Sequence, residues 1–164
     1  MPEPLRPYAG FAIRMVAAAV WLTAGIAKLA DLAHFKEQVT KYDLLPHAVV
    51  APFAYGLPFL ETGVGLYLLV GLFVPATAIV TSVLMVIFLI AQGQAWARGL
   101  RLDCGCFGSL APQKASHVGL WTMLRDVALG IPGVVLIVAP ARLWSLDARL
   151  FGLPDWWART RSTA

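Results

Sequence analysis

Long apolar segments, separated by shorter polar stretches, dominate the chain. Four segments stand out, and each contains 22 to 25 residues. Because a bilayer core about 30 Å thick needs roughly 20 apolar residues per helical crossing, each segment is long enough to span a membrane. The segments cover about residues 10–32, 50–74, 76–97 and 118–139. The pattern therefore predicts an all-α fold, with a four-helix transmembrane bundle over residues 1–139.

The connections between the four segments differ in length. The second and third segments follow each other almost directly through Val74-Pro75, which predicts an antiparallel hairpin. About 17 residues join the first two segments, and about 20 join the last two. An even number of crossings puts both termini on one side of the membrane and both long connections on the other. Residues 140–164 mix tryptophans with arginines, which predicts an amphipathic interfacial tail rather than a fifth crossing.

Composition narrows the class of protein further. The chain is 59% hydrophobic and 13% charged, with a mean hydropathy of +0.73, whereas a soluble domain is about 45–50% apolar and about 25% charged. These values exclude a water-soluble globule and a disordered tail. Basic residues meeting anionic lipid explain the net charge of +4 without any nucleic acid. Six basic residues lie near helix ends on each side, so charge alone does not orient the bundle.

Both cysteines, Cys104 and Cys106, fall in the last long connection, in the run LDCGCFG at residues 102–108. A Cys-x-Cys pair can close a disulfide, but its small ring departs from the usual Cα separation of about 5.5–6 Å. Strain of that kind makes a disulfide easier to reduce, which favours exchange over structural stapling. We therefore predict that Cys104 and Cys106 are catalytic residues in thiol–disulfide exchange.

The two cysteines have two other interpretations. Buried inert cysteines are common, but two of them so close together in a polar connection are not typical of that class. A metal site is the stronger alternative, because Cys104 and Cys106 could be joined by His117, or by His34 and His47. Thiolates with imidazole would suit zinc or copper(I). The histidines are not spaced as a motif, so we assign no metal ligands.

Charged residues inside the apolar segments give a second signal. Glu61 lies about midway along the second segment, where an ionised carboxylate costs several kcal/mol unless it is paired. Further polar residues lie toward the cysteine side of the segments: Lys28, Gln92, Gln94, Arg125 and Asp126. We predict a polar pocket beneath the cysteine connection, with Glu61 as its floor. The alternative is that a Lys28–Glu61 or Arg125–Glu61 ion pair fixes helix packing.

Arg14 lies near the other end of the first segment, away from the cysteine connection. A long basic side chain near a helix end can keep its charge in water by extending to the interface. We therefore expect Arg14 to reach the opposite membrane surface, and we assign it no chemistry.

Several short motifs together resemble a known family. They are GIAKL at residues 25–29, YDLLP at 42–46, LPFLE at 57–61 with Gly65, Gly99, DCGCFG at 103–108 and Arg125-Asp126. On these residues the chain resembles the DoxX-like membrane proteins, and most closely their MauE branch, which is named for methylamine utilisation. The resemblance covers about residues 10–138.

The resemblance implies a four-helix membrane protein associated with thiol–disulfide chemistry outside the cytoplasm, with thioredoxin-like proteins as partners. It places the protein in the cytoplasmic (inner) membrane as a multi-pass protein, with the cysteine connection outside and both termini inside. The design is also similar to that of quinone-linked disulfide-forming membrane proteins. Those proteins usually carry two cysteine pairs, whereas this chain has one, so it cannot contain a complete internal relay.

Three functions follow from these observations. In the first, a partner's thiolate attacks the Cys104–Cys106 disulfide, and electrons then pass to a quinone near Lys28, Glu61 and Arg125 or to another thiol protein. In the second, the same cysteines bind or transport copper or zinc. In the third, the protein is a non-catalytic assembly factor whose disulfide stiffens the connection. We predict the first.

Overall fold

A computed structural model of the protein describes residues 6–99, 119–138 and 145–151. Within these ranges the chain forms helices and their connections, without a strand, which confirms the predicted all-α fold. The helices are α1 (Arg6–Ala30), α2 (Leu32–Tyr42), α3 (His47–Val70), α4 (Val74–Ala97), α5 (Leu120–Val138) and α6 (Leu146–Phe151).

Four of the described helices are long and apolar enough to cross a membrane, as predicted. They cover Tyr8–Ala30, His47–Val70, Val74–Ala97 and Leu120–Val138. The boundary between the second and third spans lies earlier than expected. Gly71 ends α3 with φ 71°, a left-handed conformation that costs glycine little. Pro75 then falls in the first turn of α4, where a missing N–H does no harm.

Helix α2 was not predicted, because its 11 residues are mostly polar and lie in the connection between two spans. Its start is marked by Asp31, whose carboxylate accepts a hydrogen bond from the amide of His34 at 2.9 Å. Phe35 and Gln38 are buried on one face of the helix. The connection is therefore a packed, amphipathic element rather than a loop.

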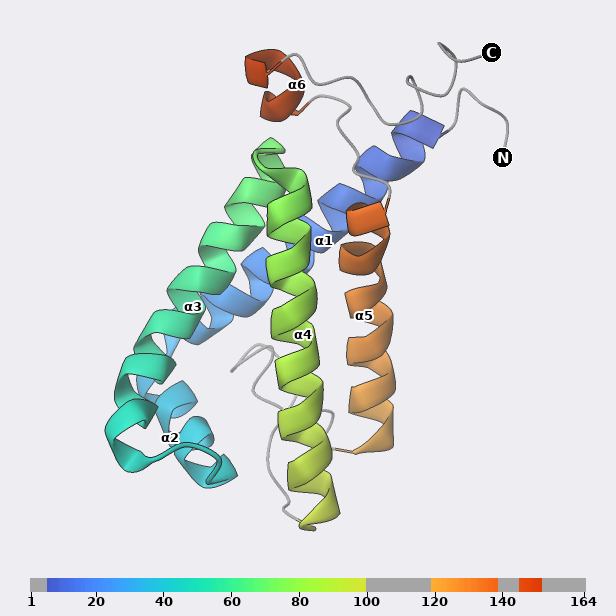
Figure 1. The fold of residues 1–164 in the computed structure, drawn as a ribbon. Helices are drawn as coiled ribbons and strands as arrows, with labels where there is room; N and C mark the ends of the chain where they lie inside the picture. Colours follow the sequence, from blue (N-terminus) through green and yellow to red (C-terminus); the bar gives the residue numbers. More distant parts are fainter. Residues whose placement is uncertain (1–5, 100–118, 139–144, 152–164) are drawn as a thin grey trace.

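The two ends of the bundle differ in what covers them (Figure 1). Helix α2, the end of α4 and the start of α5 lie at one end, which we call the α2 end. The α3–α4 turn and α6 lie at the other, which we call the α6 end. Helix α1 packs against α3 and α5, and α4 packs against α5. Helices α3 and α4 meet at their turn and diverge toward the α2 end.

Two glycines allow α1 and α3 to approach closely. A Cβ atom on Gly25 of α1 would lie 2.8 Å from the backbone nitrogen of Thr62. A Cβ atom on Gly65 of α3 would lie 2.9 Å from the backbone nitrogen of Leu22. Because neither backbone can move away easily, larger residues at these positions would push the helices apart. This contact sets the spacing of the charged groups described below.

At the α6 end, Asp147 closes the start of α4. Its carboxylate accepts hydrogen bonds from the amides of Phe73 at 2.8 Å and Val74 at 3.0 Å. Its own amide donates to the carbonyl of Gly71 at 3.1 Å. The first amides of a helix lack partners within the helix, so a carboxylate supplied from elsewhere in the chain satisfies them. This part of the C-terminal tail is docked on the bundle; an interfacial role for residues 140–164 stays a prediction.

The expectation that Arg14 reaches the membrane surface is wrong. Its side chain is 0% exposed. It packs against the α3–α4 turn, since a Cβ atom on Gly71 would lie 2.6 Å from its Nη1, and its guanidinium lies 5.3 Å from the ring centre of Phe11. The nearby carboxylate of Asp147 interacts with it electrostatically. Arg14 is therefore buried because the α3–α4 turn packs against its side chain and Asp147 supplies an opposite charge nearby.

Candidate functional site

A buried ion pair joins α1 to α3. The Nζ atom of Lys28 lies 2.7 Å from both Oε1 and Oε2 of Glu61. The two side chains are 3% and 0% exposed. Of the two ion pairs that the sequence left open, the structure contains Lys28–Glu61. The close contact of α1 with α3 at Gly25 and Gly65 holds the two charged groups at this distance.

Aromatic rings from two further helices surround the Lys28 ammonium. Its Nζ lies 5.4 Å from the ring centre of Phe35 on α2 and 5.3 Å from that of Phe88 on α4. The faces of aromatic rings attract cations at this range. Lys28 therefore connects four helices at one point: its own helix, α3 through Glu61, and α2 and α4 through the rings.

A second polar cluster joins α4 to α5. Asp126, which is 2% exposed, accepts hydrogen bonds at Oδ1 from Arg125 Nε at 3.0 Å and at Oδ2 from Gln92 Nε2 at 2.7 Å. Arg125 Nη2 also lies 3.0 Å from Asp126 Oδ1. Arg125 thus pairs with its neighbour in the chain rather than with Glu61. The bond to Gln92 fixes the start of α5 against the last turns of α4.

A small cavity separates the two clusters. It has a volume of about 30 Å³, and Lys28, Glu61 and Asp126 lie on its wall among apolar side chains such as Trp21 and Phe88. This is room for about one or two water molecules. The structure therefore brings three of the predicted intramembrane residues to one space, with Arg125 held beside it by Asp126.

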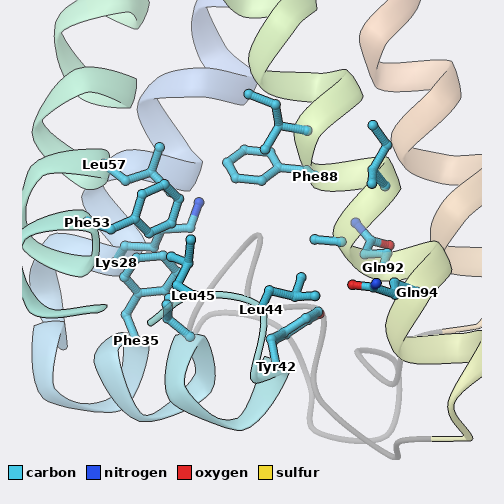
Figure 2. Close-up of a pocket in the computed structure, with 14 residues that line it drawn as sticks. Lys28, Phe35, Tyr42, Leu44, Leu45, Phe53, Leu57, Phe88, Gln92 and Gln94 are labelled. Carbon is cyan, nitrogen blue, oxygen red and sulfur yellow. The ribbon is translucent and has the colours of Figure 1, made fainter. Parts of the chain in front are cut away.

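A larger pocket lies beside Lys28, between α2, α3 and α4. Its volume is about 320 Å³. Figure 2 shows Lys28, Phe35 and Phe53 on one side and Gln92 and Gln94 on the other. Its wall is mainly apolar, unlike the polar pocket expected from the sequence, and Glu61 does not form its floor. The difference arises from α2, which adds aromatic and aliphatic side chains from the connection between the first two spans.

Cys104 and Cys106 lie in residues 100–118, outside the described residues, so their geometry stays a prediction. Both described ends of this segment lie at the α2 end (Figure 1). Before it, Arg98 Nη1 donates to the carbonyl of Tyr42 at 3.0 Å. After it, the Thr122 hydroxyl accepts from the amide of Gly119 at 2.9 Å. The segment therefore starts and finishes at the α2 end of the bundle.

The described residues bear only in part on the metal alternative. In residues 6–99, 119–138 and 145–151, no group of three His, Cys, Asp or Glu side chains could hold a metal ion. The expected ligands Cys104, Cys106 and His117 lie outside these ranges. His34 is instead close to Gln38, with 3.3 Å between its Nε2 and the amide nitrogen.

Comparison with known proteins identifies the family. The family model of the methylamine utilisation protein MauE matches residues 6–146. The chain is 38% identical over 127 residues to a methylamine utilisation protein MauE from Methylophilus methylotrophus, covering 77% of this chain. It is 39% identical over 126 residues to the protein of that name from Methylorubrum extorquens, covering 73% of this chain.

The extent of these matches differs between relatives. The chain spans 65% of the length of each of these two proteins. A MauE protein from Paracoccus denitrificans is 26% identical over 166 residues, which is 90% of this chain and 89% of that protein. No solved structure matches the chain. The family match and the four apolar helices lead to one conclusion: the chain is a multi-pass membrane protein that belongs to the MauE family.

Proposed function

We propose that the protein is a membrane thiol–disulfide redox protein whose Cys104–Cys106 pair exchanges disulfides with an extracytoplasmic thioredoxin-like or substrate protein. The single observation that supports this most is the Cys-Gly-Cys run in a segment whose two described ends lie together at the α2 end of the bundle (Figure 1). The names of the relatives add the proposal that this chemistry serves methylamine utilisation. Membership of the wider DoxX-like group is part of the same proposal.

A partner thiolate attacks one sulfur of the Cys104–Cys106 disulfide, which forms a mixed disulfide and releases the other cysteine as a thiolate. The partner's second thiolate then attacks the mixed disulfide. The partner leaves oxidised, and the pair is left as two thiols. To return to the disulfide, the pair must pass two electrons and two protons to an acceptor, either a quinone or another thiol protein.

Stable disulfides form outside the cytoplasm, where the glutathione system does not reduce them. The proposal therefore places the cysteine segment on the outer face of the cytoplasmic (inner) membrane and both termini in the cytoplasm. Helix α2 would then lie at the outer surface and α6 at the cytoplasmic surface, because they occupy opposite ends of the bundle (Figure 1).

The described polar clusters have a positioning role in this proposal. The bond between Gln92 and Asp126 at 2.7 Å ties the last turns of α4 to the first turns of α5. These turns are the two attachment points of the cysteine segment. Lys28 and Glu61 hold α2 and α3 beside them. The clusters thus restrict where Cys104 and Cys106 can lie relative to the membrane surface.

The test uses the purified protein in detergent with its cysteines oxidised. Mixed with a reduced thioredoxin-fold protein, it should oxidise one dithiol per chain and become reduced itself, as counted by thiol alkylation and intact mass. Cys104→Ser and Cys106→Ser should each abolish completed exchange. When the oxidised partner is supplied instead, the remaining thiol of one variant should attack the partner's disulfide and form a mixed disulfide, and this variant identifies the sulfur that bonds to the partner. Ser109→Ala, in the same segment, should leave the reaction unchanged.

Two results would replace this proposal. Stoichiometric copper(I) or zinc bound by the purified protein, and lost from the Cys104→Ser/Cys106→Ser variant, would support the metal function. Full maturation of partner proteins in cells that carry the double variant would support a non-catalytic assembly factor. In either case the dithiol oxidation described above should be absent.

A further inference from the structure

The larger pocket has the shape and position of a site for a molecule that dissolves in the membrane. It occupies the space left where α3 and α4 diverge toward the α2 end, and α2 closes part of that space (Figures 1 and 2). Its volume of about 320 Å³ is within the range of small-molecule sites. Ile87 and Ile90 line it and are 47% and 66% exposed on a membrane-spanning helix. The pocket therefore borders the surface of α4 that faces lipid.

Its inner wall suits a flat ring. Four aromatic side chains from three helices line it: Phe35, Tyr42, Phe53 and Phe88. Aromatic rings prefer to pack against other rings by offset stacking or edge to face. Such a wall favours an unsaturated ring over a flexible acyl chain, and the aliphatic residues at the border with lipid can accommodate an apolar tail.

The hydrogen-bonding groups suit a neutral acceptor. An ammonium group has three N–H donors, and the bonds from Lys28 Nζ to the two oxygens of Glu61 use two of them. The third can bond to a ligand in the pocket that Lys28 lines. Gln94 offers an amide on the opposite side (Figure 2). A ring that carries carbonyl oxygens on opposite edges has one acceptor for each of these two donors.

Charge argues against an anionic ligand. Lys28 is the charged residue among the described residues that line the pocket, and Glu61 already neutralises it. A fatty-acid carboxylate or a lipid phosphate would bring a second negative charge close to Glu61 in a medium of low dielectric constant, which is strongly unfavourable. The ion pair thus selects for an uncharged ligand.

We propose that this pocket binds the head group of a membrane quinone, with one ring carbonyl accepting a hydrogen bond from Lys28. Binding in this site does not depend on the cysteines. The use of the bound quinone as an electron acceptor rests on the proposed function. Two thiols that become a disulfide release two electrons and two protons, which is the number that converts a quinone to its hydroquinone.

The experiment measures binding of tritiated decylubiquinone to the purified protein by scintillation proximity. All variants are made in the Cys104→Ser/Cys106→Ser background, so that no thiol can react with the quinone and failure of the exchange chemistry cannot affect the result. Unlabelled decylubiquinone should displace the label at least about tenfold more effectively than decylbenzene, which lacks carbonyls, or decanoate, which is charged.

Two variants locate the site. Ala91→Phe places a ring inside the pocket and should weaken binding at least about tenfold. Val83→Phe places the same ring at an exposed position of α4 outside the pocket and should leave quinone binding unchanged. The neutral pair Lys28→Met/Glu61→Gln should lose affinity for the quinone but not for decylbenzene. Equal displacement by all three ligands, equal binding by the Ala91→Phe and Val83→Phe variants, or no binding at all would overturn the proposal.

Discussion

The Lys28–Glu61 pair shows how two charged residues can be retained inside an apolar bundle. Each charge alone would be very costly in the membrane interior. Together they are neutral, and the bonds of 2.7 Å from Nζ satisfy both carboxylate oxygens. The rings of Phe35 and Phe88 add a favourable electrostatic environment for the ammonium. The pair is therefore stable as a unit, and each member depends on the other.

This dependence predicts a double-mutant result. Glu61→Gln or Lys28→Met alone should destabilise the protein by about 3–5 kcal/mol, because each leaves a buried charge without its partner. The double variant should recover most of that loss, since no charge remains. The measurement is the folded fraction after heating in detergent, followed by gel filtration. If the double variant is as unstable as the sum of the single changes, the two residues are not coupled.

A second residue-scale prediction concerns Asp126. Asp126→Asn removes the charge that bonds Arg125 and weakens the contact with Gln92, so it should cost about 1–3 kcal/mol. It should also change the alkylation rate of reduced Cys104 and Cys106, because it loosens the attachment points of their segment. Leu124→Ala, on the exposed face of α5, is the matched control. An unchanged alkylation rate in the Asp126→Asn variant would remove the positioning role.

Among the elements, the contact between α1 and α3 determines the geometry of the site. Gly25 and Gly65 bring the two helices close enough for Lys28 to reach Glu61. Helix α2 then covers the α2 end and supplies Phe35 to the ammonium. At the other end, Asp147 caps α4 while Arg14 fills the space beneath the turn. Each end of the bundle is thus closed by a short helix that the apolar pattern does not reveal.

The close approach of α1 and α3 can be tested with two alanine substitutions. Gly25→Ala should destabilise the protein by about 1–3 kcal/mol, because the new methyl group would meet the backbone of Thr62 at 2.8 Å. Gly56→Ala on α3 has nothing within 4 Å and should be neutral or slightly stabilising. Melting temperatures in detergent would measure both. Equal effects at the two glycines would contradict the close contact.

The cap at the α6 end gives another prediction. Asp147→Ala should cost about 0.5–2 kcal/mol, since two amides at the start of α4 lose their acceptor. Glu37→Ala, which removes an acidic residue from the exposed face of α2, should change the melting temperature far less. If the truncation at Asp147 is as mild as that at Glu37, α6 does not hold α4.

Sequence reasoning predicted the four spans well, because about 20 apolar residues in a row have few other uses. It also selected Lys28 and Glu61, since charge inside such segments is costly. It missed α2, although Asp31 and the spacing of Phe35, Val39 and Tyr42 carry a helical signal. It misplaced Arg14, because a residue's distance from a helix end says nothing about which distant segment covers it.

For the whole molecule, the two ends of the bundle have different chemistry. The α2 end holds the pocket and both attachment points of the cysteine segment, whereas the α6 end holds the capped α3–α4 turn (Figure 1). The buried ion pair lies deeper in the bundle, at the inner side of the pocket. Four crossings place these ends on opposite sides of the membrane. The central claim is therefore one of side and redox state together: an exchangeable disulfide between Cys104 and Cys106 on the outer face.

Differential alkylation in intact cells tests this claim most directly. A membrane-impermeant maleimide is applied before and after mild reduction, and the labelled protein is weighed by mass spectrometry. We predict no labelling of Cys104 or Cys106 before reduction and labelling of both afterwards, with no effect in the Cys104→Ser/Cys106→Ser variant. Free thiols that react without reduction, or thiols that react only after the cytoplasmic face is exposed, would contradict the account.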